Sequence, residues 1–203
     1  MKDRYVNYKD LSRHEQVGKD YSIHLHFRSP QLGVFSIHGG GIETGTSELA
    51  LAIAGRDWSC YLFSGDKPRG NHRLHLTSTR FDEPLAILLA NQCERILALH
   101  GAAGDEEKVY VGGLDETWRQ HIKKCLAQQG FAAIDPPPRL GGREPENIVN
   151  RGRRKQGVQL ELTSGLRRTF FQGSGLAGRK RPTPRFYTFV NAVREAISTL
   201  SQP

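Results

Sequence analysis

The sequence predicts one α/β domain, built on a mixed, mostly parallel sheet with helices on its faces. Short apolar runs typical of strands alternate with longer runs typical of helices, which is the pattern of such a sheet. The length of 203 residues suits one hydrophobic core, because chains divide into several domains beyond about 250 residues. The sequence contains no internal repeat, so we expect residues 1–203 to form a single domain.

Several short segments have the composition of strands. Residues 21–27 alternate apolar and polar side chains, and the others are short apolar or β-branched runs. The expected strands are 21–27, 32–37, 59–63, 73–77, 95–99, 109–111 and 157–162. The polar residues 1–15 carry no such signal, and we expect them to form an irregular arm.

Longer segments rich in helix-forming residues are expected at 46–54, 83–94, 116–128 and about 184–200. The side chain of Thr46 or Ser47 would cap the first of them and Asp115 the third, because short oxygen-bearing side chains accept hydrogen bonds from the first amides of a helix. The second has proline in its first turn, where proline is tolerated. The last presents one apolar face, made of Phe186, Val190, Val193 and Ile197.

The chain carries no sign of secretion, disulfide bonding or membrane insertion. Its three cysteines, Cys60, Cys93 and Cys125, are far apart and odd in number, which argues against a disulfide scaffold and against a cysteine-ligated zinc ribbon. Cys60 and Cys93 lie in apolar runs and are expected in the core. The N-terminus lacks the apolar core of a signal peptide, and no apolar run could span a membrane. We therefore expect synthesis in the cytoplasm; action outside the cell after lysis would leave no mark in the sequence.

The formal net charge of +8 indicates an anionic partner. Nucleic acid is the commonest polyanion, but a polycarboxylate or an anionic cell wall would also suit. Arginine can hold a carboxylate through two hydrogen bonds, whereas the plainer interpretation is a solvated basic surface. The arginines near the ends of the expected strands include Arg80, Arg139, Arg143, Arg151, Arg153, Arg154 and Arg167.

The most informative motif is His38-Gly-Gly-Gly-Ile-Glu43, which follows the expected strand 32–37. Glycines permit backbone angles closed to other residues, so the loop can bring His38 and Glu43 to one point. An imidazole and a carboxylate that converge at a strand end suit a zinc ion with one position open for water. The plainer interpretation is a loop histidine beside a solvated glutamate. A phosphate cradle is disfavoured, because no Gly-Lys-[Ser/Thr] follows and Glu43 would repel phosphate.

Two further strands carry residues of the same chemistry at or near their ends. His100 ends the strand 95–99 and is followed by small residues that leave room for a ligand, and Glu161 stands within 157–162. A carboxylate there could take a proton from a water activated by the metal. The alternatives are a structural histidine and a solvent-facing glutamate of an edge strand, on the same face as Gln159. His75 is expected near the site.

Together these residues resemble the poly-γ-glutamate hydrolase family, small zinc peptidases of Bacillus phages and of prophages in their hosts. The resemblance covers roughly residues 15–200, and the motifs are specific in combination. The family is distantly similar to zinc carboxypeptidases, which implies a carboxypeptidase-like α/β fold. The matching motifs are His38-Gly-Gly-Gly-Ile-Glu43, Leu74-His-Leu-Thr-Ser78, Ala98-Leu-His100-Gly101, Val109-Tyr-Val-Gly-Gly113, Asn147-Ile-Val-Asn-Arg151 and Gly157-Val-Gln-Leu-Glu-Leu-Thr163.

The resemblance implies a catalytic domain that uses zinc to cleave the γ-glutamyl amide bonds of poly-γ-glutamate, a capsule polymer. By similarity, His38, Glu43 and His100 are the metal ligands and Glu161 is the general base. The spacing His-x4-Glu is longer here than the His-x-x-Glu of carboxypeptidases.

Substrate-binding residues are also implied. Asn150 and Arg151 are similar to the Asn-Arg pair with which carboxypeptidases hold a substrate carboxylate. Arg80 and Arg167 are expected to hold further carboxylates, because the polymer carries one on every residue and arginine binds them well.

Two other functions stay open. The first is a zinc amidase acting on N-acylated amino acids or on peptidoglycan; a small substrate would need a closed pocket, whereas a polymer needs an open groove. A basic nucleic-acid-binding protein would use the loop 139–155, but aromatic residues do not interleave with this basic run and no helix-turn-helix or RNA-recognition pattern is found. We therefore expect a monomeric enzyme with a polyanionic substrate and without a nucleic-acid or membrane partner.

Overall fold

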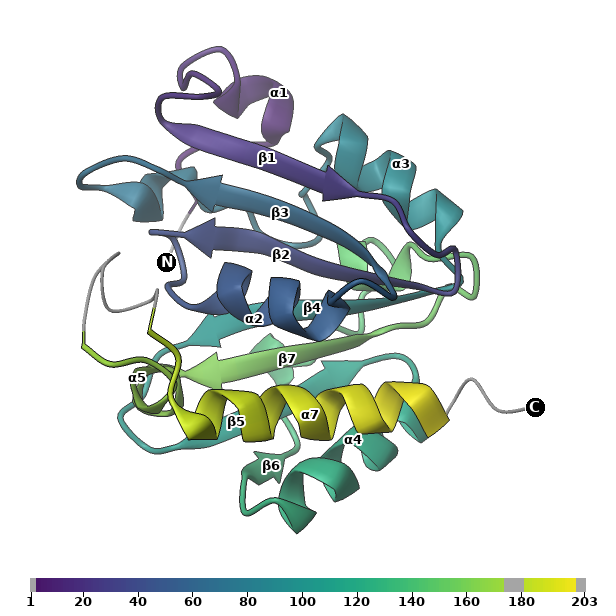
Figure 1. The fold of residues 1–203 in the computed structure, drawn as a ribbon. Coiled ribbons are helices and arrows are strands. Elements are labelled where there is room, and N and C mark those ends of the chain that lie inside the picture. The colour runs from purple at the N-terminus through teal and green to yellow at the C-terminus, as the bar shows by residue number, and fades with distance from the viewer. Residues whose placement is uncertain (1–2, 174–180, 200–203) are drawn as a thin grey trace.

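The computed structural model describes residues 3–173 and 181–199, and every structural statement below concerns these residues. They form a seven-stranded mixed sheet covered by helices on both faces, which confirms the expected α/β fold (Figure 1). The order across the sheet is β1-β3-β2-β4-β7-β5-β6. The strands are β1 (Tyr21–His26), β2 (Leu32–Gly40), β3 (Ser59–Gly65), β4 (Arg95–Ala102), β5 (Lys108–Gly113), β6 (Ala132–Ile134) and β7 (Val158–Thr163).

The central strands β3, β2, β4 and β7 run parallel, so their carboxyl ends meet at one edge of the sheet. On the two sides, β1 and β5 are antiparallel to β3 and β7, and β6 is parallel to β5. Every residue of β3 and of β7 is buried, as expected for strands covered on both faces. Ligands in such folds bind beyond the carboxyl ends of the parallel strands.

Helices form a layer on each face of the sheet. One layer contains α2 and α7, which lie in front of the strands in Figure 1, together with α4 and the short α5. The other contains α1, α3 and two 3-10 segments, Asn71–Leu74 and Ile148–Asn150. The helices are α1 (Tyr8–Leu11), α2 (Thr46–Ala54), α3 (Pro84–Gln92), α4 (Glu116–Gln128), α5 (Ser164–Thr169) and α7 (Pro184–Ser198).

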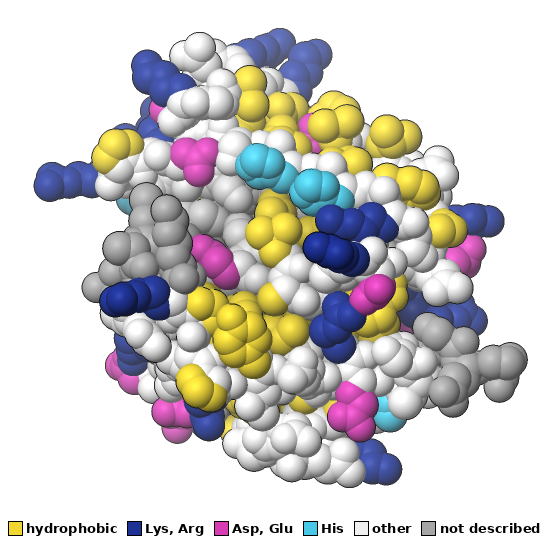
Figure 2. Space-filling model, in the orientation of Figure 1, with side chains coloured by type: hydrophobic (Ala, Val, Ile, Leu, Met, Phe, Trp, Pro, Cys, Tyr) yellow, Lys and Arg dark blue, Asp and Glu magenta, His cyan; other side chains and the backbone are white. Residues whose placement is uncertain are grey.

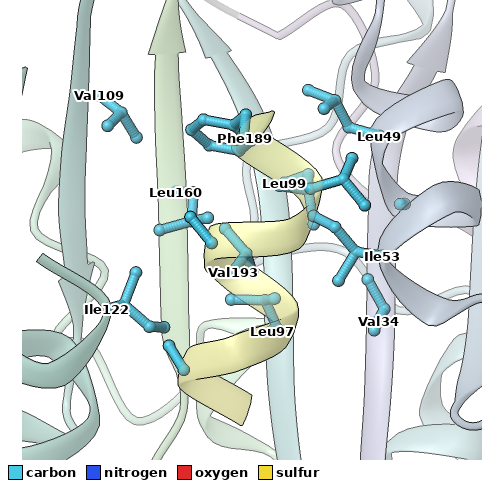
Figure 3. Packing of buried hydrophobic residues seen from close by; sticks show 14 of the residues in the cluster. Val34, Leu49, Ile53, Leu97, Leu99, Val109, Ile122, Leu160, Phe189 and Val193 are labelled. Atoms are coloured by element: carbon cyan, nitrogen blue, oxygen red, sulfur yellow. The ribbon is translucent and has the colours of Figure 1, made fainter. Parts of the chain in front are cut away.

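Successive strand residues divide between two cores. On β2, Val34 belongs to the core beneath α2 and α7, whereas Phe35 belongs to the core beneath α3. Phe189 and Val193 of α7 lie over Leu160 of β7 in the first core (Figure 3). On the outer surface of this layer, basic and acidic side chains are interspersed, so this face shows no single basic block (Figure 2).

The expected strand at 73–77 is wrong. Asn71–Leu74 form a 3-10 helix, and residues 75–77 are extended without pairing to any described strand. Leu74 and Leu76 are nevertheless fully buried in the core beneath α3. The apolar residues that predicted a strand therefore report burial of a segment that runs outside the sheet.

Some short elements gave no usable signal in the sequence. α1 lies within the expected N-terminal arm, and Tyr5 and Leu11 are buried, so this part of the arm packs onto the protein. β6 and α5 are too short to show a periodicity.

All three cysteines are free and buried, which confirms Cys60 and Cys93 as core residues. Among the described helices, none has the length and apolar character needed to cross a membrane.

The predicted helix caps were right at α4 and wrong at α2. Oδ1 of Asp115 accepts a hydrogen bond from the amide of Trp118 at 3.1 Å, which caps α4. The residue at the start of α2 is Gly45, and the hydroxyl of Thr46 instead donates to the carbonyl oxygen of Glu43 at 2.8 Å. The loop that precedes α2 uses the hydroxyl that was expected to cap the helix.

Phe189→Ala should lower the free energy of unfolding by about 3–5 kcal/mol, because it removes a fully buried ring and leaves a cavity. Phe189 packs against the rings of Phe131 and Phe170. Tyr187 lies on the same helix with 53% of its surface exposed, so Tyr187→Ala is the matched control and should cost about 0.5 kcal/mol. Denaturant-induced unfolding measures both variants, and equal losses would contradict this account of the core.

Candidate active site

A pocket of about 560 Å³ lies at the edge where the carboxyl ends of the parallel strands meet. His38, Glu43, His100 and Glu161 all line it. The structure thus brings together the four residues that the sequence singled out for metal binding and catalysis.

A β-bulge near the end of β2 aims His38 at this pocket. Ser36 pairs with Leu62 and Gly39 with Ser64, so β2 has one residue more than β3 over this stretch. The extra residue shifts the alternation of side chains along the strand. His38 therefore contacts His100, on the same side of the sheet as the core beneath α3.

The hydrogen bonds of His38 define its tautomer. Nε2 lies 2.8 Å from the carbonyl oxygen of Leu76, which can only accept a hydrogen bond, so Nε2 carries the proton. In the neutral ring, Nδ1 then has a free lone pair. This atom faces Oε1 of Glu43 at 3.2 Å and Nδ1 of His100 at 3.1 Å.

The glycine loop folds Glu43 back onto the strand end. Gly40 has φ +62°, and a side chain there would meet the carbonyl oxygen of Gly65 at 2.5 Å, so the tight turn requires glycine. The amide of Gly101 donates to Oε2 of Glu43 at 2.8 Å. Burial alone would raise the pKa of Glu43, but the neighbouring imidazoles of His38 and His100 hold it well below its usual range.

The donor atoms have the spacing of metal ligands. Nδ1 of His38 lies 3.2 Å from Glu43 and 3.1 Å from His100, and Nδ1 of His100 lies 3.7 Å from Oε2 of Glu43. Ligand atoms about 2.0 Å from a tetrahedral ion stand roughly 3.3 Å from one another. Nε2 of His100 is buried without a partner among the described residues, so this ring makes its polar contacts through Nδ1. The residues present fit a metal ion held by two imidazoles and a carboxylate.

His75 offers a further donor. His38, Glu43 and His75 each present a ligand atom within 4.8 Å of the others, so this trio could also hold a metal. However, the ring of His75 stacks on that of His38, with centroids 4.0 Å apart and planes at 26°. An imidazole binds a metal in its ring plane, and an ion in the plane of one stacked ring lies outside the plane of the other. The geometry favours His100, whose ring makes 60° with that of His38.

Asp3 fixes His75 and the wall of the pocket beside it. Its carboxylate, 1% exposed, accepts hydrogen bonds from Nδ1 of His75 at 2.8 Å, the amide of Thr77 at 2.7 Å and Arg80 at 2.8 Å. Burial would raise the pKa of Asp3, but the hydrogen bonds from Thr77 and His75 hold it below its usual value. Burial and the neighbouring imidazole of His38 lower the pKa of His75 to about 4, so this ring is neutral at pH 7.

Glu161 stands beside His100, because the two residues are partners in the parallel register of β4 and β7. β7 is an interior strand and Glu161 is buried, so the alternative of a solvent-facing residue on an edge strand is wrong. Burial raises the pKa of Glu161, the charge of His100 opposes this shift, and that of Glu43 adds to it. A buried carboxyl group with a raised pKa in a pocket wall is typical of groups that exchange protons during catalysis.

Asn150 and Arg151, two of the four residues expected to bind substrate carboxylates, instead bind backbone carbonyl oxygens of the loop beside the pocket. Asn150 is buried and donates to the carbonyl oxygens of Gly142 at 2.8 Å and Glu144 at 2.9 Å. Arg151 donates to the carbonyl oxygen of Glu146 at 2.9 Å. Neither side chain lines the pocket, and their contact with substrate stays a prediction.

The other two, Arg80 and Arg167, also lie outside the pocket lining. Arg80 binds Asp3, as described above. The guanidinium of Arg167 donates to the carbonyl oxygens of Thr44 at 2.7 Å, Leu162 at 3.1 Å and Ala102 at 3.3 Å. Arg167 therefore ties the loop that carries Glu43 to the ends of β4 and β7, and a role in substrate binding stays a prediction here too.

Apart from Arg139, much of the remaining pocket wall was not predicted from the sequence. Residues 77–79 line the pocket, and so does the loop 137–144, which contributes Arg139. Tyr110, Asn147 and Gln159 complete the lining. Polar residues inside apolar runs were the available signal, and Gln159 was the clearest example.

The fold and the site together define an α/β protein with a candidate metal-dependent catalytic site. The poly-gamma-glutamate hydrolase family matches residues 5–192, and the chain belongs to this family. Its curated relatives include UPF0714 protein YndL of Bacillus subtilis (strain 168), 35% identical over 94% of this chain and 76% of the relative. The SPbeta prophage-derived UPF0714 protein YoqZ of the same organism is 34% identical, over 97% of this chain and 72% of the YoqZ chain.

Solved structures agree with this assignment. A bacteriophage poly-gamma-glutamate hydrolase superposes with a TM-score of 0.96 at 38% identity, covering 98% of each chain. A zinc-free structure of YndL has a TM-score of 0.94 at 34% identity, covering 99% of this chain and 100% of that one. An N-formylglutamate amidohydrolase from Ralstonia eutropha, with a TM-score of 0.55 at 12% identity over 88% of this chain and 96% of that one, shares the fold alone.

Asp3→Ala should lower the free energy of unfolding by about 1–3 kcal/mol, because it leaves the amide of Thr77 and Nδ1 of His75 without their acceptor. Hydrogen exchange at the Thr77 amide should become faster. Asp105, whose side chain is 93% exposed, provides the control Asp105→Ala, with an expected change of about 0.5 kcal/mol. Unchanged stability and exchange in the Asp3 variant would show that the pocket wall does not depend on it.

Proposed function

We propose that this chain is a zinc-dependent hydrolase that cleaves the γ-glutamyl amide bonds of poly-γ-glutamate. The observation that carries the proposal is the convergence of donor atoms from His38, Glu43 and His100, 3.1–3.7 Å apart, beside the buried carboxyl group of Glu161. Membership of the poly-gamma-glutamate hydrolase family supports the substrate. The zinc-free structure of YndL indicates that this relative binds zinc, which supports the choice of metal.

Each residue has a defined part in the reaction. Zinc, when bound, supplies a Lewis acid for the water and for the scissile carbonyl group. Glu161 accepts a proton from the attacking water and delivers it to the nitrogen of the leaving amine. The proton that Glu161 takes from the water in the first step is the one that it donates in the second. The bond from His38 to the carbonyl of Leu76 keeps Nδ1 unprotonated, as a metal ligand must be.

The basic surface suits an anionic polymer. A γ-linked glutamate chain carries one free carboxylate per residue, and the net charge of +8 attracts it. Arg139 lines the pocket and is placed to meet a carboxylate close to the scissile bond. Arg80, Arg151 and Arg167 would act where the polymer extends beyond the pocket. Family membership favours such a hydrolase over the nucleic-acid-binding alternative.

The choice between His100 and His75 as a ligand can be tested by metal analysis. Wild-type protein should contain about one zinc per chain, and His100→Ala should lose most of it, because Nδ1 of His100 is one of three donors. His75→Ala should retain zinc, since the stacked ring cannot share its plane with an ion bound to His38. Loss of zinc from the His75 variant with retention in the His100 variant would exchange their roles.

Glu161→Gln should keep the fold and the zinc content but reduce hydrolysis about 100- to 10,000-fold, the usual contribution of a general acid–base group. The amide preserves the shape of the side chain and removes its ability to accept the proton. Circular dichroism and metal analysis serve as controls for folding and metal binding. Near-normal turnover would make Glu161 a structural residue.

Size analysis of poly-γ-glutamate incubated with zinc-loaded protein tests the substrate. The polymer should be shortened by internal cleavage, whereas proteins with α-peptide bonds should stay intact. Added salt should raise the apparent Michaelis constant, because exposed contacts between arginine and carboxylate are screened. Arg151→Ala should also raise the apparent Michaelis constant, because it removes one such contact. Cleavage of an N-acylated amino acid or of peptidoglycan without shortening of the polymer would assign the chain as an amidase instead.

A further inference from the structure

Gln159 is a buried polar side chain next to the proposed base. It precedes Glu161 by two residues on β7, so both side chains point to the same face of the sheet. Only 3% of Gln159 is exposed, although an apolar residue of similar length would fill the same space. Burial of an amide is unfavourable unless its hydrogen bonds are made, so the hydrogen-bond partners of Gln159 indicate its role.

The orientation of the Gln159 amide group is determined by its neighbours. Nε2 lies 3.0 Å from the carbonyl oxygen of Leu140, which can only accept, so the nitrogen and the oxygen of this amide cannot be exchanged. On the other side, Oε1 of Gln159 lies 3.2 Å from Nδ2 of Asn147. Asn147 is oriented in turn, because its own Oδ1 accepts the amide of Val149 at 3.1 Å.

These bonds leave one direction for the last hydrogen bond. Nε2 of Gln159 has two hydrogens, of which one goes to Leu140 and the other to Oε1 of Glu161 at 3.2 Å. We propose that Gln159 is a positioning residue that binds one oxygen of Glu161 and leaves the other to accept the proton from water. This inference rests on the proposed role of Glu161 as the base.

The same amide connects Glu161 to the wall of the pocket. Leu140 belongs to the loop 137–144, which forms part of the pocket wall. The next turn of this loop passes so close that a side chain at Gly142 (φ +59°) would meet Oε1 of Gln159 at 2.3 Å. The position of the loop and the orientation of Glu161 are therefore set by one side chain.

Gln159→Met tests the proposal, because methionine has a similar length and cannot donate. We expect kcat on poly-γ-glutamate to fall about 10- to 100-fold, the factor that a hydrogen bond to a charged group supplies. The Michaelis constant and the zinc content should change less than about twofold, because the hydrogen bond of Gln159 positions Glu161, the group that accepts the proton. Gln159→Glu, which keeps the shape and a partner for Asn147, should also lower kcat and serves if the methionine variant does not fold.

A matched control exists on the protein surface. Gln120 of α4 also donates from Nε2 to a glutamate oxygen, that of Glu116 at 2.7 Å, but this pair is exposed and lies outside the pocket lining. Gln120→Met should leave kcat unchanged. An unchanged kcat in the Gln159 variants as well would overturn the proposal.

A double variant separates this inference from the proposed function. In the Glu161→Gln background, Gln159→Met should cause no further loss of kcat, because the hydrogen bond acts through Glu161. An equal loss in both backgrounds would show that Gln159 acts through the pocket wall, which overturns its role as a positioning residue for the base. Full activity of Glu161→Gln alone would instead overturn the proposed function, and this inference with it.

Discussion

The carboxylate of Glu43, whose side chain is only 15% exposed, is the constraint on which the site depends. A carboxylate that is largely removed from water must be met by donors or by positive charge. The amide of Gly101 donates to it, and the imidazoles of His38 and His100 complete a set of atoms that fits a metal cation. The glycine turn that folds Glu43 back onto the sheet and the bulge that redirects His38 both serve this arrangement. Arg167 fixes the loop to the strand ends through carbonyl oxygens, so the carboxylate is held by the backbone around it.

Local patterns in the sequence predicted most of the fold. The helix at 116–128 was predicted to the residue, because an acidic cap and an amphipathic run are properties of the local chain. The strand predicted at 73–77 is absent, because apolar residues report which side chains are buried and not whether a neighbouring strand is present. Pairing partners, such as β7 between β4 and β5, are determined by contacts that no local pattern records.

The sequence revealed which candidate site residues would lie close together, but not which partners hold the residues around them. His38, Glu43 and His100 could be found because the carboxyl ends of parallel strands meet at one edge, so residues of suitable chemistry at separate strand ends converge. Asp3 could not be found, since it lies 72 residues from its partner His75 in a stretch without a periodic pattern. Arg80, Asn150, Arg151 and Arg167 have the chemistry to bind carboxylates, but the sequence does not reveal that backbone carbonyls and Asp3 already engage them.

The buried cysteines bear on how the protein withstands oxidation. Thiols react with oxidants and disulfides as thiolates, so reactivity depends on the pKa and on access. Burial raises the pKa of Cys60 to about 12 and that of Cys93 to about 11, and both side chains are closed off in the cores of the sheet. Neither needs a reducing environment to stay a thiol while the protein is folded. The two cores therefore shield these two thiols from oxidants for as long as the protein stays folded.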